Sequence, residues 1–151
     1  MKSSRKIYIL ISWVLVLICM TIIFSLSAQN GEESSELSGS FVMDLLNSLG
    51  INIDEGMLRT IAHCLEFMGL SLLMFNAVYS TWQHKLTHII AFAGTVFYAI
   101  TDEIHQLFVP DRAFQFVDIL VDSTGALIGV TVSVIILKII LKKRGNINGN
   151  T

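Results

Sequence analysis

Four long apolar runs dominate the chain, and polar segments separate them. Each run approaches or exceeds the roughly 20 residues that an α-helix needs to cross a bilayer. No alternation of period two is sustained, which argues against transmembrane strands. The pattern therefore predicts an all-α membrane protein, a four-transmembrane-helix bundle with helices at approximately residues 7–27, 58–79, 86–108 and 116–141.

The first polar segment is the longest. It begins with AQNGEESSELSGS, and the following FVMDLLNSLG has apolar side chains on one helical face, with Ser40 as N-cap and Gly50 as stop. We expect a short interfacial helix in this first outer loop, lying on the membrane surface. A helix packed on the outer end of the bundle is the alternative. Residues 145–151 are predicted to form a flexible tail, and residues 1–151 form a single domain.

The first apolar run also resembles a secretory signal peptide, because the basic MKSSRK precedes it and SLSA ends it. Its length exceeds the roughly 7–15 apolar residues of a signal peptide, which favours a retained helix.

Composition supports a membrane location. The chain has 151 residues, of which 53% are hydrophobic and 15% charged, whereas about 25% of residues are charged in an average soluble domain. The net charge of −2 and the lack of a basic stripe exclude a nucleic-acid partner. Cys19 and Cys64 lie inside apolar runs, so we expect buried thiols and no disulfide framework.

Basic residues are segregated in a way that predicts topology. With four spans and an inside amino terminus, eight of the ten fall on one side, which the positive-inside rule assigns to the cytoplasm. Arg59 and Arg112 remain on the other side. We therefore predict a multi-pass protein of the cell membrane with both termini cytoplasmic, from the positions of Lys2, Arg5, Lys6, Lys85, Lys138, Lys142, Lys143 and Arg144.

Polar side chains interrupt the outer halves of three predicted helices. At 1.5 Å per residue, Glu66 lies roughly 12 Å and Asp122 roughly 9 Å inside the outer ends of their helices. Spacings of three and four residues place each helix's polar residues on one face. Because charged groups are costly in lipid, these faces should meet. We predict a cluster of His63, Glu66, Asp102, Gln106 and Asp122, with Gly125 allowing close helix packing.

Three explanations of this cluster remain open. Arg59 with Glu66, and Arg112 with Asp118 or Asp122, could be ion pairs that fix helix register, although two arginines cannot neutralise five acids. The spacings in HCLE and DEIH are compatible with zinc, iron or manganese ligands. A histidine–carboxylate pair could instead act as a general base, with an arginine holding an anion.

The segment TDEIHQLFVPDR ends the third helix, and we predict that it forms the rim of an outward-facing site. Pro110 should stop the helix. Arg112 would then turn back across the mouth of the bundle, where its planar guanidinium can hold a carboxylate bidentately.

These motifs resemble the VanZ-like family of small bacterial membrane proteins. The resemblance covers roughly residues 24–129, including FSLSAQ, RTIAHCLEF and the run YAITDEIHQLFVPDRAFQFVDILVDSTGALIG. Thr60 stands where the family often has a basic residue. The resemblance implies a role in the bacterial envelope, and the family's namesake is associated with resistance to teicoplanin, a lipid-tailed glycopeptide.

Two function classes follow. In the first, an outer-leaflet site binds an anionic lipid-linked glycan or lipoglycopeptide, with membrane lipids as further partners. In the second, the protein is a membrane-embedded hydrolase or transferase. Ion transport is disfavoured, because the inner half has no acids. We expect no resident cofactor, with a divalent metal as the alternative. The ligand-binding candidates are Arg59, Arg112, Asp118 and Asp122, and the catalytic candidates are His63, Glu66, Asp102, Glu103 and Gln106.

Overall fold

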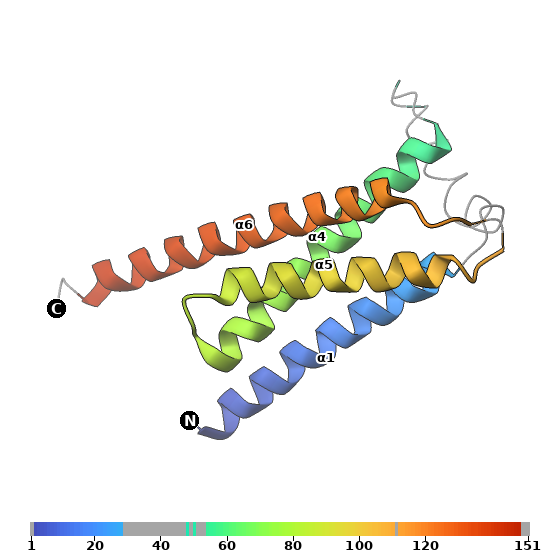
Figure 1. The fold of residues 1–151 in the computed structure, drawn as a ribbon. Helices are drawn as coiled ribbons and strands as arrows, with labels where there is room; N and C mark the ends of the chain where they lie inside the picture. Colours follow the sequence, from blue (N-terminus) through green and yellow to red (C-terminus); the bar gives the residue numbers. More distant parts are fainter. Residues whose placement is uncertain (1, 29–47, 49, 51–53, 111, 149–151) are drawn as a thin grey trace.

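The computed structural model of the chain describes residues 2–28, 48, 50, 54–110 and 112–148. Its regular structure there is helical throughout, as predicted. Long helices cross the molecule alternately in opposite directions, so that both termini and the α4–α5 turn lie at one end (Figure 1). These helices are α1 (Lys2–Ser27), α4 (Glu55–Trp82), α5 (Thr87–Gln106) and α6 (Phe116–Asn148).

Three of these helices are long and apolar enough to cross a membrane: Ser3–Ser27, Gly56–Trp82 and Phe116–Lys143. The helix α5 has 20 residues, but its last turns contain Asp102, Glu103 and other polar residues that lower its mean hydropathy. The fourth predicted span therefore stays a prediction.

Helix α4 is longer at both ends than its apolar run. Its N-cap is Asp54, whose side chain accepts a hydrogen bond of 2.7 Å from the backbone N–H of Met57. At the other end Gln83 adopts a left-handed conformation (φ 49°), and its N–H donates to the Tyr79 carbonyl. This left-handed residue turns the chain directly into α5.

Other limits also differ from the predicted ones. Helix α5 ends at Gln106, two residues before the predicted Phe108, because the chain turns ahead of Pro110. Helix α6 continues to Asn148 and so includes the first residues of the predicted tail. A glycine such as Gly145 costs a helix only about 1 kcal/mol. The predicted interfacial helix lies almost entirely outside the described residues.

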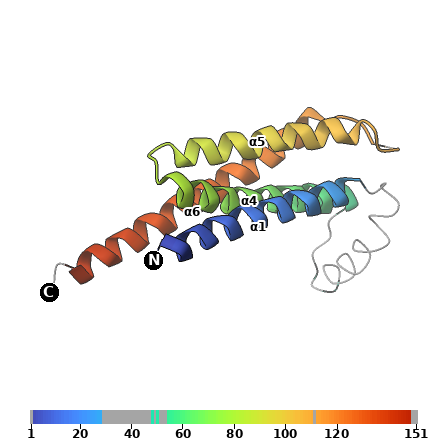
Figure 2. The ribbon, with the colours of Figure 1, turned by 90° about the horizontal axis from the view of Figure 1, so that it is seen from below.

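Helix α4 is the centre of the bundle, since it packs against each of the other three helices. In Figure 2 it lies between α5 and α1. Its contact with α6 depends on two glycines of α6. A Cβ atom at Gly125 would collide with the backbone of Cys64, and one at Gly129 with Ser71 and the Met68 carbonyl. The two backbones can approach this closely because glycine has no side chain.

Helix α1 packs on α4 and α5 through apolar and polar contacts. Val16 and Ile23 are buried in one cluster with Phe67 and Leu70 of α4. The Trp13 indole N–H donates to the Thr81 hydroxyl at 3.1 Å. In a membrane, such hydrogen bonds between helices help to fix their register.

Candidate functional site

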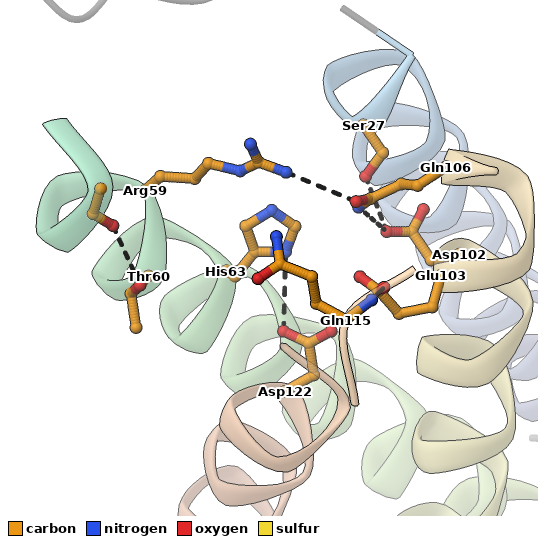
Figure 3. Close-up of polar contacts among 10 residues, drawn as sticks. Ser27, Arg59, Thr60, His63, Asp102, Glu103, Gln106, Gln115 and Asp122 are labelled. Carbon is orange, nitrogen blue, oxygen red and sulfur yellow. Dashed lines mark hydrogen bonds and ion pairs between the residues drawn. The ribbon is translucent and has the colours of Figure 1, made fainter. Parts of the chain in front are cut away.

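Polar side chains from five different parts of the chain converge at the end of the bundle away from the termini. Figure 3 shows Arg59 and His63 on α4, Asp102, Glu103 and Gln106 on α5, and Asp122 on α6 around one space. Ser27 at the end of α1 and Gln115 in the α5–α6 connection join them. The three helices thus present their polar residues at one level of the bundle.

A pocket of about 250 Å³ opens beside these residues, and three of them, Arg59, His63 and Gln115, line it. Helix α4 supplies one wall, and α6 with the preceding connection supplies the other. Cationic, anionic, amide and hydroxyl groups are therefore all within reach of a molecule in the pocket. Its lining residues are Gly56, Arg59, Thr60, His63, Gln115 and Asp118.

His63 and Asp122 form the central pair of the site. The His63 Nδ1 atom lies 3.6 Å from an Asp122 carboxylate oxygen, a separation within ion-pair range but longer than a hydrogen bond. Asp122 is fully buried and His63 is 8% exposed. The close approach of α6 at Gly125, one turn further along, brings the carboxylate to the imidazole. A histidine beside a buried carboxylate can hold and release a proton.

A hydrogen-bonded chain links α1 to the pocket through α5. The Ser27 hydroxyl donates to Asp102 Oδ2 at 2.7 Å, and Gln106 Nε2 donates to the same oxygen at 3.4 Å. The Arg59 guanidinium then donates to Gln106 Oε1 at 3.4 Å. All three side chains from Ser27 to Gln106 are at most 2% exposed.

Glu103 fixes the connection between α5 and α6. Its carboxylate accepts a hydrogen bond of 2.8 Å from the backbone N–H of Gln115, and the side chain is fully buried. Glu103 thereby places Gln115 at the pocket wall. In this structure it positions the chain, although the sequence pattern placed it among the catalytic candidates.

The predicted arginine ion pairs do not form. Among the residues that the structure describes, His63–Asp122 is the single acid–base pair within 4.0 Å. Arg59 contacts Gln106 instead of Glu66, because the amide of α5 reaches the mouth of the pocket. Glu66 lies within electrostatic range of His63, Asp102 and Asp122 without a direct polar contact.

Arg112 lies among the acids of the site, but no direct partner of its side chain is found in the described part of the chain. Its Nε and Nη1 atoms are buried and have no hydrogen-bond partner among the described residues. Burial lowers the pKa of Arg112, and the nearby charge of Arg59 lowers it further, whereas Asp102 and Glu103 raise it. Because the ordinary value is so high, the guanidinium stays charged at neutral pH.

Several other buried polar atoms of the site also lack a hydrogen-bond partner in the described part of the chain. Buried polar groups without partners are rare in folded proteins and typically mark water, ion or ligand positions. Here they belong to both acids and bases, and they surround one space. They are His63 Nδ1, Asp102 Oδ1, Glu103 Oε1 and both Asp122 carboxylate oxygens.

The metal alternative receives no geometric support. Among the described residues, no three His, Cys, Asp or Glu side chains are placed to hold a metal ion. His105, one of the ligands in that alternative, stacks on Phe24 of α1 with ring centroids 4.0 Å apart. This stacking places its imidazole against α1.

The sequence pattern did not predict four residues of the site, which are Ser27, Gly56, Thr60 and Gln115. Gln115 stands three residues before Asp118, but it precedes the apolar run that predicted the last helix. For Ser27, the available signal was a hydroxyl in the last turn of an apolar helix, where it can bond to a neighbouring helix.

This arrangement defines a small helical protein of the multi-pass membrane type, with a polar pocket at one end of its bundle. Residues 12–138 match the model of the VanZ/LLP1 family, and the chain belongs to that family. The resemblance inferred from the motifs is thereby confirmed. Comparisons with curated proteins and with solved structures gave no match.

Proposed function

We propose that the protein binds the anionic head group of a lipid-linked or lipoglycopeptide-type molecule in the outer leaflet of a bacterial membrane. The main observation behind this proposal is the pocket, whose lining joins Arg59, His63 and Gln115. Guanidinium, imidazole and amide donors in a concave site suit a phosphate or carboxylate together with sugar hydroxyls.

The orientation of the pocket follows from the distribution of charge. Both termini and the α4–α5 turn, which contains Lys85, lie at the end of the bundle opposite the site (Figure 1). If that basic end is cytoplasmic, the pocket faces outward. Helix α5 is then the fourth span, with its polar end shielded by α1, α4 and the α5–α6 connection.

Lipid linkage of the ligand is supported by the surroundings of the pocket. Phe114 and Phe116, on either side of Gln115, have 41% and 65% of their surface exposed. An amphiphile with its head group at Gln115 would meet apolar side chains there, and exposed aromatic rings suit the interface of a bilayer. A contribution to glycopeptide resistance would follow if the ligand is a lipid-tailed glycopeptide or its envelope target.

The test is binding by purified protein in nanodiscs. A polyprenyl phosphate, a neutral polyprenol and teicoplanin are titrated, and affinity is measured by fluorescence or native mass spectrometry. We expect saturable binding of the phosphate or of teicoplanin, and at least about tenfold weaker binding of the polyprenol, since one charge-assisted interaction contributes about 1.5–3 kcal/mol. Equal affinity for phosphate and polyprenol would contradict an anion site.

An enzyme is the second candidate, and the His63–Asp122 pair beside the pocket favours it. The imidazole would accept a proton from water or a hydroxyl, and the carboxylate would stabilise the imidazolium. His63→Gln then separates the two classes. Turnover of a polyprenyl-linked phosphate by the wild type and its loss in His63→Gln, with binding retained, would support catalysis. Binding without product in the wild type would support the binding function.

A further inference from the structure

We propose that Asp102 is a positioning residue, which acts through the Gln106 amide to hold the Arg59 guanidinium at the mouth of the pocket. Ser27 of α1 completes this arrangement, here called the relay: Ser27, Asp102, Gln106 and Arg59 (Figure 3). The inference rests on the proposed function in one respect, namely that Arg59 contacts the ligand.

The relay has a defined polarity. A glutamine amide has a donor end and an acceptor end, whereas a guanidinium has donors alone. Arg59 therefore needs the oxygen of Gln106, which it contacts at 3.4 Å. The amide is held in this orientation because its nitrogen faces Asp102 Oδ2. A reversed amide would turn its N–H groups toward Arg59 and its oxygen toward a carboxylate.

Burial makes this polarity effective. Asp102 is 2% exposed and Gln106 is fully buried, so water cannot easily replace either contact. Inside a protein an unmatched polar contact is costly, and adjoining hydrogen bonds reinforce one another. The short bond from Ser27, at 2.7 Å, fixes Asp102 Oδ2 where Gln106 needs it. Helix α1 thereby influences the pocket without contributing to its lining.

The relay gives Asp102 and Gln106 a different role from the catalytic one predicted from the sequence. Neither residue lines the pocket. Both side chains lie behind Arg59. Substitution of either residue should therefore make the Arg59 guanidinium more mobile and weaken ligand binding together. Asp102 Oδ1 is buried without a partner among the described residues, so the carboxylate retains capacity for one more donor.

Reversing the polarity of the relay tests it. In Asp102→Leu, the Gln106 amide loses the carboxylate that orients it, and the contact to Arg59 should be lost. In the double variant Asp102→Asn/Gln106→Glu, the total charge equals that of the wild type. The introduced asparagine amide can then donate to the introduced glutamate and to Ser27, and that glutamate can accept from Arg59. The control Gln106→Leu removes the acceptor of Arg59 directly and keeps Asp102.

The primary readout is the guanidinium of Arg59 in an arginine-labelled NMR spectrum in micelles, assigned with Arg59→Lys. A held guanidinium gives separate Nη signals, and a free one gives averaged signals. We expect separate signals in the wild type and in Asp102→Asn/Gln106→Glu, and averaged signals in Asp102→Leu and in the control Gln106→Leu. Ser27→Ala should broaden them, whereas Ser27→Thr and the control Ser25→Ala should not.

Affinity for polyprenyl phosphate in nanodiscs is the second readout, with a loss of about tenfold in Asp102→Leu and recovery in the asparagine double variant. Circular dichroism and gel filtration identify variants that do not fold. Separate Arg59 signals in Asp102→Leu, or in Gln106→Leu, would overturn the relay. If the Arg59 signals follow the expected pattern but the wild type binds no probe, the relay holds and the proposed function fails.

Discussion

Arg112 differs from the other charged residues of the site because it combines a position among acids with free hydrogen-bonding capacity. Arg59 is already bonded to Gln106, and His63 is paired with Asp122. Arg112 has two buried nitrogen atoms without partners among the described residues. It therefore keeps donors for an anionic partner, although it is not among the residues that line the pocket.

Substitution of Arg112 by lysine tests this role. Lysine keeps the charge but cannot form two parallel hydrogen bonds. We expect Arg112→Lys to abolish ligand binding or glycopeptide protection while expression and membrane insertion stay near normal. Binding in nanodiscs and antibiotic susceptibility measure the effect. The matched control is Arg5→Lys at the opposite end of the bundle, where the guanidinium contacts the Ser80 carbonyl. Full activity of Arg112→Lys would contradict bidentate recognition, and loss of folded protein would indicate a structural role.

The spacing of residues predicted the composition of the site better than its pairings. His63, Asp102 and Asp122 were expected to converge because helical periodicity placed each on one face. The partner of each side chain depends on the distance and rotation between helices, which no local pattern contains. Gly125 sets the separation of α4 and α6 and so selects His63 as the partner of Asp122.

Among the helices, α4 and α6 form the closest pair. Gly125 faces the backbone of Cys64, whereas Gly69 of α4 has no atom within 4 Å of an added Cβ. The same substitution should therefore have opposite effects at these two positions.

We expect Gly125→Ala to destabilise the protein by about 1–3 kcal/mol, because the methyl group forces the helices apart. Gly69→Ala should be neutral or stabilise it by up to about 1 kcal/mol, because alanine favours a helix over glycine. Unfolding in mixed micelles of increasing denaturing detergent measures both. Similar stabilities for the two variants would contradict the close packing at Gly125.

Helix α1 is an integral part of the bundle, although its sequence resembles a signal peptide. Its removal would expose Phe67 and Leu70 and would leave Asp102 without Ser27. We therefore expect the mature protein to retain α1. Intact-mass measurement of protein extracted from membranes tests this. A species that begins near Ala28 would show that α1 is cleaved.

The helix boundaries show where prediction from sequence was limited. Apolar runs located the helices to within a few residues at most ends, because length and hydropathy determine what can cross a membrane. The start of α4 was missed because its first turn is polar and depends on the Asp54 cap. The end of α5 was missed because Leu107 and Phe108, although apolar, lie in a turn outside the helix.

Most of the basic residues and the polar pocket lie at opposite ends of the molecule, which leads to a topological prediction. We expect cysteines introduced at Gln83 and Asn146 to be protected in intact cells, and one at Ser35 to be labelled. Cys19 and Cys64 are first replaced by serine or alanine. Impermeant maleimide provides the measurement, with permeabilised cells as the control. Strong labelling at Gln83 or Asn146 in intact cells would contradict cytoplasmic termini.

The bond between Glu103 and Gln115 has a consequence for biosynthesis. Helix α5 reaches the insertion machinery before its partner segment, so Glu103 lacks its Gln115 donor until translation has passed residue 115. The segment between α5 and the final helix therefore supplies this hydrogen bond to Glu103. A nascent chain that ends at Pro110 should be recognised by membrane proteases and have a shorter half-life in a pulse-chase experiment than the full chain. Equal half-lives would mean that α5 is accommodated without the segment that follows it.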